Sequence, residues 1–347
     1  MKQLFVFRWL TWPFRYTFSK IKRKIGKLDE VRIEVFLVLS NRSQVFLKGR
    51  LVEAYTQSRP SEDKSALQNL LATIRRYSGS SVPDAGLGLQ IGDQQTDLTT
   101  DSEGIFEVMM PLPDKMEEIP DKIQLSLKPE EDLQSSEPVV EKKIHFIHKT
   151  YPRAIISDID DTIIVSKATN LGEKLWLSVS KNAYTRRPFP GVSDFYRLLS
   201  ANGEYPVFYV SSSDWNLFEL IRDFLRYRDI PVGPILLKDS HVNLRNIWKS
   251  GGGNHDHKLE KIRFLMEFFP EQQFLLIGDS GQHDPELYAE VIRDFPGRVE
   301  AVYIRRVGKQ DPDRERELDQ LLPPNKAAWV KSTQEALLHA RTHLNVS

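Results

Sequence analysis

At residues 156–163 the chain reads Ile156-Ser157-Asp158-Ile159-Asp160-Asp161-Thr162-Ile163, directly after the apolar pair Ala154-Ile155. An apolar run that ends in polar residues is typical of a buried strand whose carboxyl end faces a site. The three carboxylates within four residues repel one another, and a bound divalent cation is the simplest way to stabilise them at a strand end. Because positions i and i+2 share a face of an extended chain, Asp158 and Asp160 are expected to converge on one site. Carboxylate and carbonyl oxygens suit Mg²⁺, which is the cofactor that this stretch predicts.

Two other interpretations of the acidic stretch stay open at this point. The first is an acidic turn that lies in solvent. The second is the Asp-x-Asp-Asp metal site of terpene cyclases, although those enzymes are helical and the stretch here follows a strand-like apolar run.

Around this stretch, short apolar runs alternate with segments of helical periodicity. The runs are 154–156, 207–210, 235–237, 274–277 and 299–304. Short buried strands separated by helices indicate a parallel sheet with helices on both faces, an α/β fold of the Rossmann-like type. Ligands bind to such sheets beyond the carboxyl ends of the strands, so the polar residues that follow each run are the candidate site residues.

Two of these runs are followed by residues that suit phosphate and metal chemistry. The run 207–210 precedes Ser211-Ser212-Ser213-Asp214, and the run 274–277 precedes Gly278-Asp279 and, five residues after Asp279, Asp284. Hydroxyl groups at a strand end can donate hydrogen bonds to phosphate oxygens. Asp279 and Asp284 are expected to complete the metal site. Capping of the following helix by Ser213, Asp214 or Asp284 is the alternative use of these side chains.

A glycine-rich stretch at residues 251–257 leads to Lys258, just ahead of a helical segment. A lysine at this place can balance the charge of a phosphoryl group and of the acidic cluster. Lys238, which follows the run 235–237, is the alternative for this role. His255 and His257 do not predict a zinc site, because no further ligand at a suitable spacing appears.

The first half of the chain has a different pattern, with period-two alternation and turn residues. It predicts short strands at 31–35, 44–52, 87–91 and 105–108, and a helix at 67–77. Short strands with turns suggest a small β-sandwich, and no residue cluster in this half is typical of catalysis. The predicted organisation is a basic, aromatic segment at 1–28, a β-rich sandwich-like domain at 29–150 and an α/β domain at 151–347.

The composition excludes several classes of protein. The chain has 347 residues and no cysteine, which rules out disulfide frameworks, thiolate metal sites and cysteine nucleophiles. Lys plus Arg and Asp plus Glu both total 48, and this balance argues against a general nucleic-acid-binding protein. The absence of cysteine fits a reducing compartment, so we expect a cytoplasmic location.

The beginning of the chain carries an excess of positive charge. Residues 1–28 contain eight Lys and Arg residues and no Asp or Glu, together with aromatic residues such as Trp9, Trp12 and Phe14. Aromatic and cationic residues without acids are typical of a segment that lies on an anionic membrane surface. Arg8 interrupts the apolar run, which is too short to span a bilayer. The alternative is a basic tail or a helix packed on the rest of the protein.

The order of these motifs resembles that of the haloacid dehalogenase superfamily of phosphotransferases, which begins with Asp-x-Asp-x-Thr. Within it, the chain more closely resembles the actin-patch-protein family of Mg²⁺-dependent phosphatidate phosphatases. The residues that carry the resemblance are 156–163, 187–192, 208–213, 257–258 and 277–286. The resemblance covers roughly residues 150–310 and reaches weakly into 45–50. Asp214 departs from the family pattern, because many members have Pro at this position, but no catalytic or binding role is implied for it.

The resemblance implies a role for each matching residue. Asp158 is implied to be the nucleophile that forms an aspartyl-phosphate, and Asp160 the acid that protonates the leaving alkoxide and then activates water. The implied metal ligands are Asp158, the backbone carbonyl of Asp160, Asp279 and, through water, Asp284. The substrate-binding residues predicted with them are Thr162, Ser211, Ser212 and Lys258.

The expected function is that of a Mg²⁺-dependent phosphatase acting on a phosphate monoester, with phosphatidate at a membrane surface as the expected substrate. Only about 40 residues separate Thr162 from the second apolar run, and an active site without a large lid suits lipids or proteins. Two alternatives remain: a phosphatase of the same mechanism on soluble esters or phosphoproteins, and a non-enzymatic interaction protein with a vestigial site. No nucleic-acid partner is expected, and the sequence names no partner for the β-rich domain.

Overall fold

The computed structural model describes residues 30–41, 43–53, 81–112, 121–129, 133, 137–146, 151–165, 188–238, 256–308, 312–344 and 346. These residues belong to two compact units, one with strands β1 to β8 and one with the elements from β9 to α9. The predicted boundaries after residues 28 and 150 fall outside the described residues and stay predictions. The basic segment 1–28 and the predicted helix at 67–77 also lie outside them.

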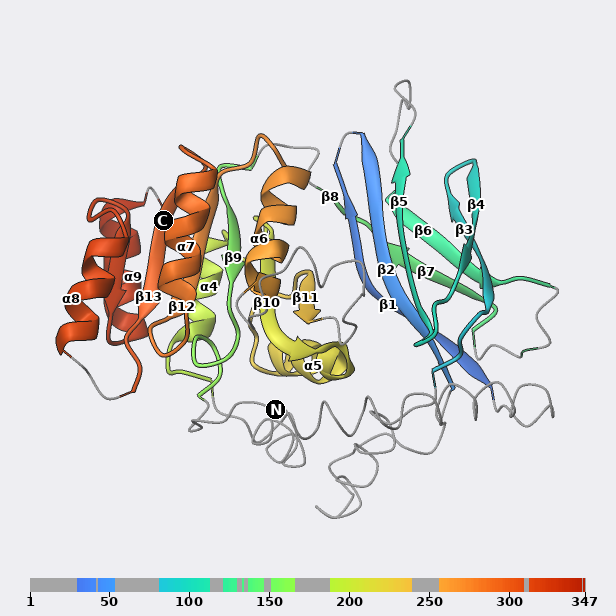
Figure 1. The fold of residues 1–347 in the computed structure, drawn as a ribbon, viewed down its shortest axis with the longest axis horizontal. Helices are drawn as coiled ribbons and strands as arrows, with labels where there is room; N and C mark the ends of the chain where they lie inside the picture. Colours follow the sequence, from blue (N-terminus) through green and yellow to red (C-terminus); the bar gives the residue numbers. More distant parts are fainter. Residues whose placement is uncertain are drawn as a thin grey trace, which may run out of the picture. The chain divides into compact units, whose positions relative to one another are not determined.

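The first unit contains two four-stranded sheets (Figure 1). One sheet has the order β5-β2-β1-β8, with β1 (Val31–Ser40), β2 (Gln44–Glu53), β5 (Ile105–Pro111) and β8 (His145–Phe146). The other has the order β4-β3-β6-β7, with β3 (Gly86–Ile91), β4 (Gln94–Thr99), β6 (Lys122–Leu127) and β7 (Val139–Lys143). Neighbouring strands are antiparallel except for β1 and β8.

Apolar residues of both sheets form one hydrophobic core in this unit. Leu47 and Leu51 from the first sheet and Leu87 and Leu125 from the second are fully buried members of it. In β3, buried and less buried residues alternate, as expected for a strand with one face on a core. The predicted sandwich-like domain is therefore confirmed.

The second unit is built on a six-stranded parallel sheet with the order β11-β10-β9-β12-β13-β14. Its strands are β9 (Ala154–Ser157), β10 (Val207–Asp214), β11 (Ile235–Lys238), β12 (Phe274–Asp279), β13 (Val299–Arg305) and β14 (Ala327–Val330). Every residue of β9 and β12 is buried, which explains why these strands read as continuous apolar runs. The five predicted strands are confirmed, and β14 is an additional one.

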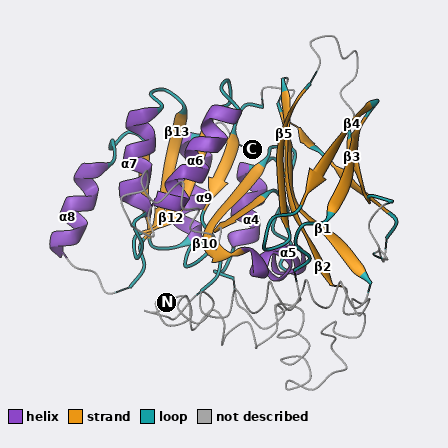
Figure 2. Cartoon of the chain, turned by 45° about the vertical axis from the view of Figure 1, so that its right-hand side comes forward, coloured by secondary structure: helices purple, strands orange, loops and turns teal. Residues whose placement is uncertain are grey.

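Helices cover both faces of this sheet (Figures 1 and 2). They are α4 (Val192–Leu199), α5 (Phe218–Tyr227), α6 (Asp256–Phe268), α7 (Asp284–Asp294), α8 (Pro312–Leu321) and α9 (Thr333–His343). Helices α6 and α7 pack together on one face, and α4 and α9 pack together on the other. The predicted α/β class with helices on both faces is thus confirmed. Within the described part of the chain, no helix is long and apolar enough to cross a membrane.

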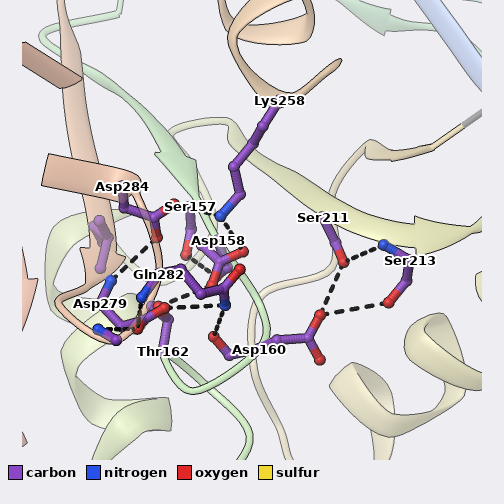
Figure 3. Close-up of polar contacts among 12 residues, drawn as sticks. Ser157, Asp158, Asp160, Thr162, Ser211, Ser213, Lys258, Asp279, Gln282 and Asp284 are labelled. Atoms are coloured by element: carbon purple, nitrogen blue, oxygen red, sulfur yellow. Dashed lines mark hydrogen bonds and ion pairs between the residues drawn. The ribbon is translucent and has the colours of Figure 1, made fainter. Parts of the chain in front are cut away.

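The strand order fixes the position of the site. Strand β9 comes first in the chain but lies inside the sheet, with β10 and β11 on one side of it and β12, β13 and β14 on the other. The strand order therefore reverses between β9 and β12, and in sheets of this kind ligands bind beyond the carboxyl ends of the strands at such a point. Polar residues at the carboxyl ends of β9, β10 and β12 meet at this place (Figure 3).

Candidate active site

Three buried carboxylates form a cluster at the carboxyl edge of the parallel sheet (Figure 3). Asp158 follows β9, Asp279 ends β12 and Asp284 begins α7. One oxygen of each carboxylate lies within 4.8 Å of the corresponding oxygens of the other two. Each residue is at most 1% exposed. The structure thus brings together three of the four predicted metal ligands.

The loop between β12 and α7 fixes the orientation of the two carboxylates that it carries. Asp279 Oδ1 accepts hydrogen bonds from the backbone N–H groups of Gly281 (2.7 Å) and Gln282 (3.0 Å). Asp284 Oδ2 accepts one from the backbone N–H of Asp279 (3.1 Å). A Cβ atom on Gly278 would lie 2.5 Å from Asp284 Oδ2, so only glycine fits beside this carboxylate.

Asp284 does not cap the helix that follows it. The N-cap position of α7 is His283, and Asp284 is the first helical residue, with its side chain turned to the cluster. Strand β10 continues to Asp214, and the N-cap position of α5 is Leu217, without a side-chain hydrogen bond. The alternative interpretation of Asp284 as a cap is therefore wrong, whereas capping by Ser213 or Asp214 of the helix that begins at Trp215, the 3-10 helix η2 (Trp215–Leu217), stays a prediction.

Lys258 provides the positive charge in the cluster. It lies in the first turn of α6 and is only 4% exposed. Its Nζ atom is 2.8 Å from Asp158 Oδ1 and also donates to Asp284 Oδ1. Lys238 instead ends β11, which is separated from β9 by β10. The structure therefore brings Lys258, and not Lys238, to the carboxylates.

Burial and mutual repulsion make two of these carboxylates, Asp158 and Asp279, hold protons more strongly than usual. Burial raises the pKa of Asp158 well above its ordinary value, against the opposing effect of Lys258. Burial, together with the charge of Asp284, raises the pKa of Asp279 to about 7. Burial alone would lower the pKa of Lys258, but the carboxylates of Asp158 and Asp284 outweigh it and raise that pKa. One ammonium group thus faces three acidic groups, and this oxygen-only donor set fits a hard divalent cation such as Mg²⁺.

The carboxylate of Asp160 turns away from this cluster. Its Oδ2 atom accepts hydrogen bonds from Ser211 Oγ (3.0 Å) and Ser213 Oγ (3.4 Å), at the end of β10. Within the described residues, the Asp160 carboxylate is not part of the group of Asp158, Asp279 and Asp284, although its charge still contributes to raising the pKa of Asp158; strand β9 ends at Ser157. The period-two rule applies only within an extended strand. The predicted contribution of Asp160 to the metal site therefore depends on its backbone carbonyl.

The predicted substrate-binding residues contact different members of the site. Thr162 Oγ1 donates to Asp158 Oδ2 (3.1 Å), and Ser211 Oγ accepts from the backbone N–H of Ser213 (3.0 Å) while donating to Asp160. Ser212 lies between these two serines, whose hydroxyl groups share the face that meets Asp160 (Figure 3). The structure thus also brings Ser213, which was not among the predicted site residues, to Asp160, and the predicted role of Ser212 in substrate binding stays a prediction.

Two further residues support the site and were not predicted. The side-chain amide of Gln282 donates to the backbone carbonyl of Asp160 (3.2 Å) and to Asp279 Oδ2 (3.1 Å). The buried guanidinium of Arg305 donates to the backbone carbonyl of Thr162 (3.3 Å) and to Thr333 Oγ1 (2.8 Å). The alternation of Ser211 and Ser213 along one strand would have found Ser213, but a single amide or guanidinium carries no comparable sequence signal.

The fold and this cluster define an α/β protein with an acidic, oxygen-lined site at the switch point of its sheet. Residues 153–306 match the sequence model of a family described as the catalytic domain of phosphatidate phosphatase APP1. The resemblance that the motifs predicted is therefore confirmed for this part of the chain.

Two relatives share this region. A phosphatidate phosphatase APP1 of Saccharomyces cerevisiae is 32% identical over 155 residues, which are 45% of this chain and 26% of that protein. An uncharacterised protein of Schizosaccharomyces pombe is 28% identical over 155 residues, 44% of this chain and 25% of that protein. The chain thus spans about a quarter of the length of these curated relatives.

Among solved structures, a carbohydrate acetylesterase from Xanthomonas citri aligns with 83% of this chain and 73% of its own, at 11% identity and a TM-score of 0.24. That score is too low to indicate a common fold.

Proposed function

We propose that the protein is a Mg²⁺-dependent phosphatase that hydrolyses a phosphate monoester through a covalent aspartyl-phosphate on Asp158, with phosphatidate in a membrane as its substrate. The observation that carries this proposal is the buried cluster of Asp158, Asp279, Asp284 and Lys258 at the carboxyl end of β9. The cluster lies within the region that matches the APP1 catalytic domain, and the S. cerevisiae relative is named a phosphatidate phosphatase.

The proposed metal ligands are Asp158, Asp279 and the backbone carbonyl of Asp160, with Asp284 as a support. When bound, the ion would neutralise the crowded carboxylates and attract a phosphoryl oxygen. Asp158 has to be ionised to act as a nucleophile, while burial raises its pKa. Lys258 opposes that rise through its 2.8 Å contact with Asp158 Oδ1, and so favours the reactive carboxylate.

In the first step, a carboxylate oxygen of Asp158 forms a bond to phosphorus while the bond to the leaving alkoxide breaks, and Asp160 gives that alkoxide a proton. In the second step, Asp160 takes a proton from a water molecule whose oxygen attacks the same phosphorus. The bond between Asp158 and phosphorus then breaks, which releases inorganic phosphate and restores both carboxyl groups. Lys258, Thr162 and Ser211 bind the phosphoryl oxygens as charge builds up on them.

The hydrogen bonds of Asp160 support its role as the proton carrier. Its carboxylate is held by the hydroxyl groups of Ser211 and Ser213, and its side chain lies apart from the proposed metal ligands. A carboxyl group outside the coordination sphere keeps its capacity to gain and lose a proton, whereas a metal-bound carboxylate is held in the ionised form. The two aspartates of the motif can therefore carry different chemistry.

The lipid part of the proposal is supported by the sequence of residues 1–28, which combine eight cations with aromatic side chains and no acids. Such a segment favours adsorption to an anionic bilayer, where a phosphorylated lipid is presented. Deletion of residues 1–28 should weaken binding to anionic vesicles and slow lipid hydrolysis there. Hydrolysis of a water-soluble ester should change little, because every proposed catalytic residue follows Tyr151.

The test is phosphate release from phosphatidate in vesicles and from soluble phosphate esters and a phosphoprotein, each with and without Mg²⁺. We expect release from the vesicles that is lost after chelation and restored by Mg²⁺. In Asp158→Asn, which retains the volume but not the nucleophile, turnover should fall by about three or more orders of magnitude. Activity above about a tenth of wild type in this variant would exclude the covalent mechanism. Faster release from the soluble esters or the phosphoprotein than from the vesicles would exclude the lipid as the substrate. If no phosphate were released from any of these esters, the protein would not be a phosphatase, and a role as a non-enzymatic interaction protein would remain.

A further inference from the structure

The side-chain amide of Gln282 joins two loops that contribute different parts of the site (Figure 3). Gln282 lies half-buried in the loop between β12 and α7. Its Nε2 atom is 3.2 Å from the backbone oxygen of Asp160 and 3.1 Å from Asp279 Oδ2. The first oxygen belongs to the segment that follows β9, and the second belongs to the last residue of β12.

Regular sheet pairing does not fix the distance between these two oxygens. The last paired residues of β9 and β12 are Ser157 and Ile277, so Asp160 and Asp279 both lie beyond the end of the ladder. An amide nitrogen carries two N–H groups and can therefore serve two acceptors at once. Gln282 thus continues the link between the two strands past the point where the backbone hydrogen bonds end.

The same residue also fixes the orientation of the Asp279 carboxylate. Its backbone N–H donates to Asp279 Oδ1 at 3.0 Å while its side chain donates to Oδ2. The backbone N–H of Gly281 adds a third hydrogen bond, to Oδ1 at 2.7 Å. A carboxylate held by donors on both oxygens has little freedom to rotate. Oδ1 uses both of its lone pairs on the two backbone donors, whereas Oδ2 keeps one lone pair for another partner.

We infer that Gln282 is a positioning residue of the metal site, whose amide sets the spacing between the Asp160 carbonyl and Asp279 so that both oxygens reach one cation. This inference rests on the proposed function, because it takes these two oxygens as ligands. Gln282 acts through Asp160 and Asp279 and takes no part in the reaction itself. Hydrogen-bond partners of metal ligands typically contribute about 10- to 100-fold to metal affinity or activity.

The test compares Gln282→Met, which retains similar volume but cannot donate, and Gln282→Ala with the wild-type protein. Mg²⁺ binding is measured by calorimetric titration, and thermal unfolding is followed in chelator and in Mg²⁺. We expect the Mg²⁺ dissociation constant to rise by about 10-fold or more in both variants. The Mg²⁺ concentration needed for half-maximal activity should rise by the same factor, whereas turnover at saturating Mg²⁺ and the KM for a soluble ester should stay near wild type.

Gln124→Met is the matched control. Gln124 donates its side-chain amide to Glu141 Oε1 at 2.8 Å on the surface of the β unit, so the variant loses an amide–carboxylate hydrogen bond away from the site. Its Mg²⁺ affinity should equal that of the wild type.

Two results would overturn the inference. If the Gln282 variants bind Mg²⁺ as the wild type does, the amide does not position the ligands, whatever happens to turnover. If the wild-type protein itself binds no Mg²⁺ in the titration, the metal site of the proposed function fails, and this inference fails with it. The wild-type titration therefore distinguishes the two failures.

Discussion

Replacement of Lys258 by Met removes the ammonium group that faces the acidic cluster while keeping most of the side-chain volume. Lys258 is 4% exposed, and its contacts are with two residues that are themselves buried, Asp158 and Asp284. The variant leaves three carboxyl groups crowded together without this cation. We expect it to be less stable, to an extent that depends on pH and on Mg²⁺.

The size of the effect follows from the geometry. Two unit charges 2.8 Å apart attract each other by about 6 kcal/mol at an effective dielectric constant of about 20. Desolvation of the ammonium group offsets part of this attraction, and the loss of one partner from a buried ion pair typically costs about 3–5 kcal/mol. We therefore expect the free energy of unfolding of Lys258→Met to fall by about 3–5 kcal/mol at a pH where the carboxylates are ionised.

The pH dependence has a definite sign. Lys258 lowers the pKa of Asp158, so its removal raises that pKa further above the value in the unfolded chain. The folded variant then binds more protons than the unfolded one, and its stability falls as the pH rises. The difference from wild type should be large near pH 8 and smaller near about pH 5. Added Mg²⁺ should restore part of the loss, since it binds the folded state.

The assay is urea unfolding of both proteins at several pH values, first in chelator and then in Mg²⁺. Lys122→Met is the control, because Lys122 makes an exposed ion pair with Glu141 at 3.6 Å and its loss should change stability by less than about 1 kcal/mol. A pH-independent loss below about 1 kcal/mol for Lys258→Met would refute the electrostatic argument. Equal losses with and without Mg²⁺ would refute the metal part of it.

Two further substitutions test the packing of the site and the electrostatics of the β unit. Gly278→Ala places a methyl group 2.5 Å from Asp284 Oδ2, so it should displace that carboxylate, cost about 1–3 kcal/mol in thermal unfolding and reduce phosphate release. Burial alone would raise the pKa of Glu34, but the guanidinium groups of Arg50 and Arg32 outweigh it and lower that pKa. Its stabilising effect is thus present at neutral pH and lost in acid. Glu34→Gln should cost about 2 kcal/mol near pH 7, and its unfolding curve should approach that of wild type below about pH 4; an equal cost at both pH values would contradict this reasoning.

The parallel sheet and the acidic cluster could be predicted because the signals are local. Buried parallel strands form continuous apolar runs, and the residues after those runs meet at one edge whatever the details of the loops. This rule is sufficient to bring Asp158 and Asp279 to one edge of the sheet, whereas the sequence left Lys258 and Lys238 as alternatives for the lysine. In the β unit, the strands β4, β6, β7 and β8 were not predicted. In β4, Leu98 is the only buried residue, so the alternation is weak.

The side chains that hold the site were harder to predict because their contacts depend on the turns. The divergence of Asp158 and Asp160 arises where β9 ends, at a residue that the apolar run does not mark. Gln282 reaches Asp160 across 122 residues of sequence, and Arg305 reaches Thr162 across 143. Such contacts follow from the distance between two loops in space, and periodicity carries no information about it.

The hydrogen bond between Arg305 and Thr333 has a consequence for how the catalytic region is delimited. The family match ends at residue 306, whereas Thr333 begins α9 and β14 pairs with β13 along its edge. A protein cut after residue 306 would expose the outer edge of β13 and remove one of the acceptors of the Arg305 guanidinium, which lies next to the turn that carries Thr162. A domain boundary drawn from sequence similarity alone would therefore remove residues that support the active site. An expression fragment has to extend through α9 to retain the hydrogen bond between Arg305 and Thr333 and the pairing of β13 with β14.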